Sequence, residues 1–177
     1  MMTRIRTGVL VAVVALAAAT LGSPAAAGAD GAAAKVETFE RLGFQPGPGG
    51  GLVLNWGFSP RVISVPSGSI VKWTNATEAG ELHAVTLVSA AHVPQTIDEV
   101  FNCGVCNEAL AKHDADGKPP IDHLLVNVGK TGLNTEGDSR ILLPHQSLFA
   151  TVTAPAGTTL NYVCSIHPWM QAKIHVT

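Results

Sequence analysis

Near its C-terminus the chain carries three metal-binding types of side chain, in the run Tyr162-Val163-Cys164-Ser165-Ile166-His167-Pro168-Trp169-Met170. Cys164, His167 and Met170 supply a thiolate, an imidazole and a thioether at intervals of three residues. Sulfur donors favour Cu(I), imidazole binds copper in either oxidation state, and two histidines, one cysteine and a weak axial methionine form an electron-transfer copper site. The run therefore indicates copper, with one histidine still missing. The alternative is a strand end with a buried cysteine, a surface histidine and a core methionine.

The missing histidine is predicted to be His83. Alternate residues of a strand face opposite sides of its sheet, so in the strand expected over residues 82–87 His83 points inward with its apolar neighbours. Cys164 points inward at the end of the strand expected over residues 158–164. A core histidine bonded to a backbone carbonyl is the commoner arrangement in proteins. Because Cys164, His167 and Met170 are available as further ligands, we favour the interpretation that His83 is a metal ligand.

The chain from residue 52 onward is patterned as short β-strands. Turn-forming residues such as Pro66-Ser67-Gly68 and Pro155-Ala156-Gly157 separate β-branched or alternating runs. These runs cover residues 61–65, 69–75, 82–87, 147–153, 158–164 and 173–176. Strands of this length and spacing predict an all-β fold, an antiparallel sandwich or barrel.

The N-terminus predicts export. Arg4 and Arg6 precede an apolar run and a stretch of small residues that ends at Ala27, the three regions of a secretory signal peptide. We therefore expect a signal peptide at residues 1–27, a flexible segment rich in Gly, Ala and Pro at 28–51, and one domain at 52–177. The destination is the periplasm, the cell envelope or the exterior. The mature chain has no apolar run long enough to span a membrane.

The charge of the exported chain argues against nucleic acid as a partner. Without Arg4 and Arg6, nine Lys and Arg face 13 Asp and Glu, which leaves about four net negative charges. We expect the protein to be a monomer.

Three cysteines leave one unpaired when two of them join. Cys103 and Cys106 are the obvious pair, in the run Cys103-Gly104-Val105-Cys106, and we predict a disulfide between them. Cys164 then stays free, as copper ligation requires. Reduced, redox-active thiols are one alternative, and half of a zinc site is another, although no second Cys-x2-Cys completes it.

Taken together, these residues resemble the cupredoxins, small blue copper proteins of the plastocyanin and amicyanin type. The resemblance covers residues 58–83, which end in His83, and residues 137–176, which contain the cysteine run. It implies a Greek-key β-sandwich of eight strands that holds one type 1 copper ion. It also implies the ligand set, with Met170 axial and three equatorial ligands, His83, Cys164 and His167.

The resemblance further implies a role for the surface near the site. In the family, the edge of the second histidine ligand is exposed within an apolar patch and passes electrons to a docked redox protein, a part that falls to His167 here. Trp169 is expected either at this surface or in the core.

Two departures from the family pattern stand out. The residue after the first predicted ligand is Ala84, where the family often has an asparagine whose side chain holds the ligand loop. The Ala84 amide can still bond the thiolate. The second departure is an insertion over residues 89–138, which is too long for a simple loop.

The insertion has helical signals. Thr96 and Glu99 fit a capping box, and residues 107–113 favour a helix, so one or two short helices are expected, with a strand over 124–128. Its histidines, His92, His113 and His123, are expected to face solvent.

The predicted function is that of an exported blue copper protein which shuttles single electrons between redox partners. We expect no enzyme activity. Copper enzymes with cupredoxin folds commonly place a histidine beside the type 1 cysteine, whereas Val163 and Ser165 flank Cys164, and no hydrolase nucleophile elbow is present. The alternative is an envelope copper carrier or storage protein that uses the same ligands without passing electrons.

Overall fold

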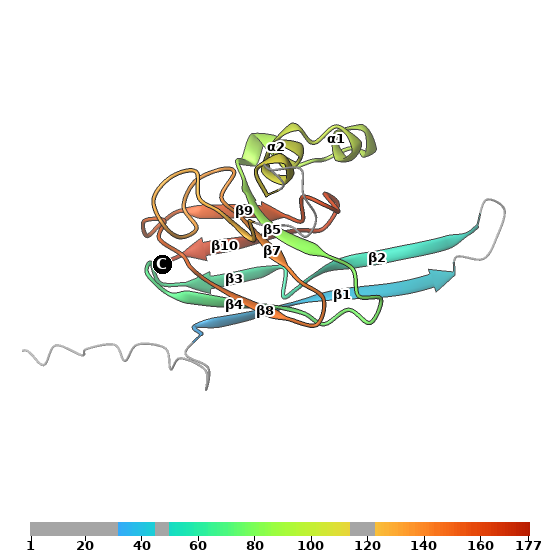
Figure 1. Cartoon of the computed structure of the whole chain (residues 1–177), viewed down its shortest axis with the longest axis horizontal. Helices are drawn as coiled ribbons and strands as arrows, with labels where there is room; N and C mark the ends of the chain where they lie inside the picture. The colour runs from blue at the N-terminus through green and yellow to red at the C-terminus, as the bar shows by residue number, and fades with distance from the viewer. Residues whose placement is uncertain (1–31, 45–49, 114–122) are drawn as a thin grey trace, which may run out of the picture.

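Two packed β-sheets form the body of the protein, with short helices on one side (Figure 1). The computed structural model describes residues 32–44, 50–113 and 123–177. A four-stranded sheet has the order β2-β1-β4-β8, and a six-stranded sheet has the order β3-β10-β9-β5-β7-β6. The all-β sandwich predicted from the sequence is confirmed.

The strands of each sheet come from distant parts of the chain. The four-stranded sheet consists of β1 (Ala34–Phe44), β2 (Leu52–Ser59), β4 (Ile70–Asn75) and β8 (Ser147–Thr151). The six-stranded sheet consists of β3 (Val62–Val65), β5 (His83–Val88), β6 (Leu125–Val126), β7 (Ser139–Leu142), β9 (Thr159–Val163) and β10 (Gln171–Val176). Neighbouring strands are antiparallel except β1 with β4 and β3 with β10, which are parallel.

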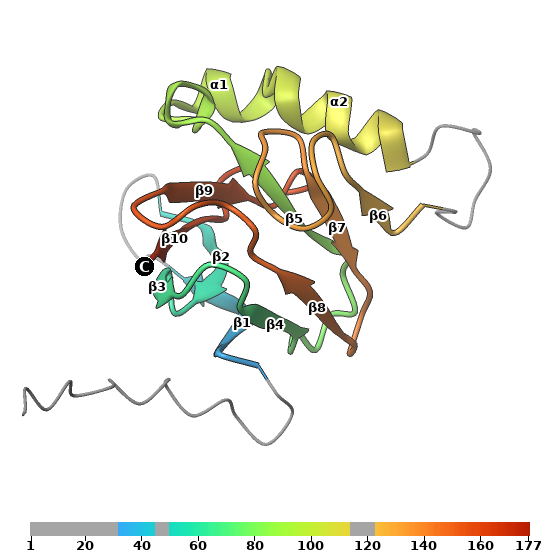
Figure 2. The same cartoon turned by 90° about the vertical axis from the view of Figure 1, so that its left-hand side faces the viewer.

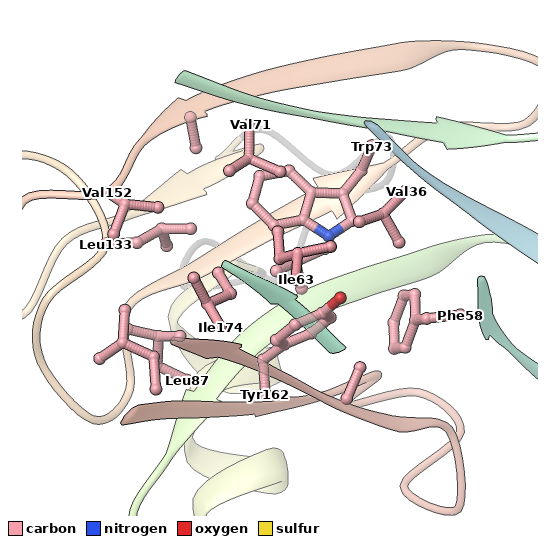
Figure 3. Packing of buried hydrophobic residues seen from close by; sticks show 14 of the residues in the cluster. Val36, Phe58, Ile63, Val71, Trp73, Leu87, Leu133, Val152, Tyr162 and Ile174 are labelled. Atoms are coloured by element: carbon pink, nitrogen blue, oxygen red, sulfur yellow. The ribbon is translucent and has the colours of Figure 1, made fainter. Parts of the chain in front are cut away.

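The core fills the space between the two sheets (Figure 3). Tyr162 of β9 is fully buried, and its ring centroid lies 4.9 Å from that of Phe58 and 6.0 Å from that of Trp73. Strand alternation produces this arrangement, because every second residue of β4 and of β10 is buried. The rigid end of β9 then leads directly into Cys164.

The insertion forms helices on the outer face of the six-stranded sheet (Figure 2). These are η1 (Ala90–His92), α1 (Ile97–Phe101) and α2 (Gly104–His113). The expected capping box begins α1, with the Thr96 side chain accepting a hydrogen bond from the Glu99 backbone N–H over 3.2 Å. Because the helices cover one face of β5 and the core covers the other, every residue of β5 is buried.

A disulfide fixes the start of α2. It joins Cys103 and Cys106, whose Cα atoms lie 5.2 Å apart. Both cysteines are buried and pack against Val88 of β5 and Val163 of β9. The bond therefore holds the insertion against the outer side of β9, and the residue after β9 is Cys164, a free and buried cysteine.

The N-terminal part of the chain differs from the sequence prediction. Residues 34–44, expected within a flexible segment over 28–51, form β1, which pairs with β2 on one side and β4 on the other. Pairing on both sides satisfies the backbone of a segment whose own pattern is weak. The described residues form ten strands where the family resemblance implied eight, and β1, β2 and β7 were not predicted.

Two predictions concern the membrane and export. The predicted signal peptide at residues 1–27 lies outside the described residues. Among the residues that are described, no helix has the length and apolar character needed to cross a membrane.

Candidate metal centre

Three of the predicted ligands converge at one end of the sandwich. His83 begins β5, Cys164 follows β9, and His167 lies in the loop before β10. The Cys164 Sγ atom lies 3.8 Å from Nδ1 of His83 and 3.6 Å from Nδ1 of His167. The three ligand atoms all lie within 4.8 Å of one another. Antiparallel pairing of β5 with β9 produces this meeting, because the start of one strand lies beside the end of the other.

The loop from Cys164 to Met170 is closed by its own backbone. The Cys164 N–H donates to the Met170 carbonyl over 2.9 Å, and the Met170 N–H donates to the His167 carbonyl over 2.8 Å. The His167 N–H donates to the Cys164 carbonyl over 3.0 Å. Met170 is fully buried. These bonds fix the cysteine, the histidine and the methionine as parts of one tight turn.

The Ala84 backbone supports the sulfur atom. Its N–H donates to Cys164 Sγ over 3.2 Å, as the sequence analysis allowed. The asparagine tie that the family often has is absent, and Gln171 makes a different connection. Its Nε2 donates to the Pro94 carbonyl over 2.7 Å and to the Pro168 carbonyl over 3.1 Å. The ligand loop is therefore tied to the insertion.

Two tryptophans cover the second histidine. The Trp56 ring, on β2, meets the His167 ring edge-on with centroids 4.8 Å apart, and Trp169 lies 5.2 Å from the same ring. His167 is only 9% exposed, which differs from the exposed edge that the resemblance implied. The difference arises from β2, which was not predicted to reach the site. Trp169 is 43% exposed and lies at the surface.

Burial sets the protonation states of the three ligand groups. Burial, followed by the charge of His167, lowers the pKa of His83 to about 4. Burial also lowers the pKa of His167, against the opposing charge of Glu81. Burial raises the pKa of Cys164 to about 11, although backbone N–H groups act in the opposite direction. At neutral pH both imidazoles are neutral and the thiol is protonated, so a metal ion that binds here displaces one proton.

The two sulfur–nitrogen distances fit a single ion. Nitrogen at about 2.0 Å and sulfur at about 2.3 Å from one metal, with a bond angle near 120°, lie about 3.7 Å apart. The observed Sγ–Nδ1 distances of 3.6 Å and 3.8 Å match this separation. A buried thiolate with two neutral imidazoles is a donor set that suits copper. The residues present therefore fit a copper ion.

The histidines of the insertion lie away from this group. His113 was expected to face solvent and is instead buried, with Nδ1 bonded to the His123 carbonyl and Nε2 2.8 Å from Ser139 Oγ. His113 ends α2 and faces β7, where Ser139 is the partner of Nε2, and the His123 carbonyl is the partner of Nδ1. His92 is exposed, and its Nδ1 lies 2.6 Å from the Glu136 carboxylate. Within the described part of the chain, the only candidate metal group is the one at His83, Cys164 and His167.

Sequence reasoning missed two residues at the site, Trp56 and Glu40. Trp56 covers His167, and Glu40 Oε1 lies 3.4 Å from Nε2 of His83. The two residues are directly opposite each other in the register of β1 and β2. The sequence signal that could have identified Glu40 was its alternation with Val36 and Thr38. Alternate residues of a strand have side chains on the same face of the sheet.

No protein-family model and no curated protein matches the chain. Among solved structures it is similar to reduced auracyanin from Roseiflexus castenholzii, with 19% identity, coverage of 68% of this chain and 87% of that one, and a TM-score of 0.40. It is similar to a purple cupredoxin from Nitrosopumilus maritimus, with 16% identity, coverage of 68% and 82%, and a TM-score of 0.38. It is also similar to a reduced Cu(I) form of an amicyanin mutant, with 20% identity, coverage of 88% and 92%, and a TM-score of 0.43. The two sheets and the His-Cys-His group of this chain agree with the sandwich and with three of the ligands that its resemblance to the cupredoxins implies.

Proposed function

We propose that this protein binds one copper ion and shuttles single electrons between redox proteins. The ion would be held by Nδ1 of His83, Sγ of Cys164 and Nδ1 of His167, with Met170 as a weak fourth ligand. The observation that carries the proposal is the approach of both Nδ1 atoms to one sulfur, over 3.8 Å and 3.6 Å, among buried side chains.

Rigidity of the ligands supports electron transfer. When bound, copper supplies a one-electron Cu(II)/Cu(I) couple whose potential depends on the axial ligand and on hydrogen bonds to the sulfur. The Ala84 N–H holds the sulfur, and the closed turn holds His167. Ligands held in this way rearrange little when the charge of the site changes. A slow geometric step is thereby avoided.

Burial of the ligands favours an electron carrier over a copper carrier. His83 and Cys164 have no exposed surface, and His167 is 9% exposed. Handing copper to another protein requires ligands that an incoming thiol or imidazole can reach. Here Trp56 and Trp169 pack against the His167 ring and leave little of it within reach. Copper carriage or storage is therefore the alternative function, and the second experiment below tests it.

The partner surface is proposed at the tryptophans. Trp169 is 43% exposed and contacts both His167 and Trp56, so the aromatic rings connect the ligand to the surface. Leu42 is 71% exposed and lies two residues beyond Glu40 on β1. A redox protein with an apolar docking face fits this surface.

Export is part of the proposal. The signal-peptide pattern at residues 1–27 supports it, and so does the disulfide between Cys103 and Cys106, because structural disulfides persist in oxidising compartments. The destinations consistent with both are the periplasm, the cell envelope and the exterior.

The first experiment adds Cu(II) to the purified mature protein and records visible and electron paramagnetic resonance spectra. An intense blue sulfur-to-copper band with narrow hyperfine splitting is expected. Cys164→Ser removes the band, whereas the double variant Cys103→Ser with Cys106→Ser keeps it. A colourless wild-type protein, or a band that depends on Cys103 and Cys106, contradicts the proposal.

The second experiment separates electron carriage from copper carriage. Voltammetry of the copper-loaded protein is expected to give a reversible one-electron wave, and a chelator in excess is expected to remove copper slowly. An irreversible wave together with rapid loss of copper to the chelator supports the copper carrier instead.

A further inference from the structure

The β1–β2 hairpin reaches past the other strands to the candidate metal centre. Figure 1 shows both strands running beyond the rest of their sheet. Glu40 of β1 lies directly opposite Trp56 of β2 in the strand register. It follows Val36 and Thr38 on the inward face of β1, both of which are buried. A carboxylate at this position is directed to the interior side of the sheet, where an acidic group needs a partner.

That partner is the imidazole of His83. Glu40 Oε1 lies 3.4 Å from His83 Nε2, and the Glu40 side chain is 10% exposed. Both atoms are buried, and neither makes a hydrogen bond of regular geometry to any described residue, including the other atom of the pair. One of these atoms is a potential donor and the other an acceptor, and they face each other at a separation slightly longer than a usual N–H···O bond.

The other nitrogen of the His83 ring, Nδ1, determines whether Nε2 carries the proton in its contact with Glu40. Nδ1 of His83 faces Cys164 Sγ over 3.8 Å, so its lone pair is directed at the position that fits a metal ion. A neutral imidazole with a free Nδ1 lone pair carries its proton on Nε2. The Nε2–H group therefore lies on the side of the ring that faces Glu40, whose Oε1 is an available acceptor 3.4 Å away.

We propose that Glu40 is a positioning residue for His83, an inference that rests on the proposed copper function. Its carboxylate accepts the Nε2–H, fixes the tautomer and ring orientation, and directs Nδ1 at the metal. Carboxylates that bond the distal nitrogen of a metal-bound histidine orient the ring and raise its basicity. The added negative charge also favours Cu(II) over Cu(I). The β1–β2 hairpin thus supplies a control on the potential as well as a cover.

The test compares Glu40→Gln and Glu40→Leu with a matched control, Glu37→Gln. Glu37 lies on the same strand and carries the same charge, but its side chain is exposed on the opposite face. Three readouts are used: Cu(II) affinity, reduction potential, and the nitrogen-15 NMR signals of the His83 ring in the metal-free protein. Glutamine keeps an oxygen acceptor at nearly the same place, so Glu40→Gln is expected to fold.

The two substitutions are expected to differ. Glu40→Leu lowers Cu(II) affinity about 10- to 100-fold, the usual loss when such a partner is removed. Glu40→Gln recovers part of the affinity but loses the charge, so its potential rises. Each tenfold weakening of Cu(II) relative to Cu(I) corresponds to a rise of about 59 mV. In the metal-free wild type the His83 ring is protonated at Nε2, and Glu40→Leu mixes the two tautomers. Glu37→Gln leaves all three readouts unchanged.

The outcomes separate this inference from the proposed function. Suppose that the wild type is blue, and that Glu40→Gln and Glu40→Leu have the same reduction potential and the same Cu(II) affinity. That result overturns the role of Glu40 and leaves the proposed function standing. Equal shifts in Glu40→Gln and Glu37→Gln also overturn it, because they indicate only a general charge effect. If the wild type binds no copper, the function fails, and the NMR signals alone decide whether Glu40 orients the ring.

Discussion

The backbone N–H of Ala84 donates a hydrogen bond to the Sγ atom of Cys164 over 3.2 Å, across 80 residues of sequence. The bond joins the start of β5 to the residue that follows β9. Three groups surround the sulfur, namely the amide and the two imidazoles. A site whose ligands the fold holds in place loses little free energy to ordering them when an ion binds.

Gln171 is predicted to stabilise the ligand loop. Gln171→Ala removes two hydrogen bonds, to the carbonyls of Pro94 and Pro168, and should lower the free energy of unfolding by about 1–2 kcal/mol. Denaturant unfolding of the metal-free protein measures this. The control is Gln95→Ala, which removes one exposed bond to the Val93 carbonyl and should change stability by less than about 0.5 kcal/mol. Equal effects of the two substitutions would show that the tie is unimportant.

Met170 is predicted to tune the site without being required for its colour. Met170→Leu is nearly isosteric at a fully buried position, so it should cost less than about 1.5 kcal/mol of stability. The blue band should persist, because its thiolate donor remains. The potential should rise, since a site with one fewer donor favours Cu(I). Spectra and voltammetry of the loaded variant provide the measurement, and loss of the blue band would contradict a weak axial role.

Trp56 is predicted to restrict access to His167. Trp56→Leu removes the edge-on contact at 4.8 Å, worth about 0.5–1.5 kcal/mol beyond the area buried, and uncovers the imidazole edge. Electron exchange with a small inorganic oxidant should become several-fold faster, as stopped-flow absorbance at the blue band would record. Phe149→Leu, which alters an exposed ring on β8, is the control. An unchanged rate in the Trp56 variant would rule out the proposed cover.

His113 is predicted to make the protein less stable in acid. Burial is the main reason that its pKa lies below the ordinary value of 6.5. The unfolded chain binds a proton below pH 6.5 that the folded chain does not, so the contribution of His113 is complete above pH 6.5 and is lost as the pH falls through the folded pKa.

His113→Gln tests this contribution in the metal-free protein. The slope of unfolding free energy against pH, measured below pH 6.5, should decrease by up to about 1.4 kcal/mol per pH unit. Part of the slope should remain, because the pKa values of His83 and His167 are also lowered. A slope equal to that of the wild type would mean that His113 charges as easily in the folded protein as in the unfolded chain.

The ligand loop could be predicted because its information is local. Cys164, His167 and Met170 lie within one short run, and their residue types specify the chemistry directly. His83 was predicted from strand alternation, which depends only on residues 82–87. The structure brings its Nδ1 to within 3.8 Å of Cys164 Sγ. Periodicity and residue type therefore sufficed for the three groups that converge.

The covering hairpin could not be predicted in the same way. Glu40 is a charged residue next to a Gly-rich stretch, and such residues are usually exposed. Its burial depends on the pairing of β1 with β4, a partner more than thirty residues away. His113 was misassigned for a similar reason, since its partner Ser139 belongs to β7, a strand that the pattern did not indicate. Contacts between distant segments decided both cases.

X-ray absorption at the copper edge of the loaded protein, recorded in the Cu(II) and Cu(I) states, tests the central claim most directly. The expected result is one short copper–sulfur bond and two copper–nitrogen bonds from imidazole, with little change between the two states. Cys164→Ser should remove the sulfur signal. A wild-type spectrum without a sulfur neighbour, or a change of ligand number on reduction, would contradict the account.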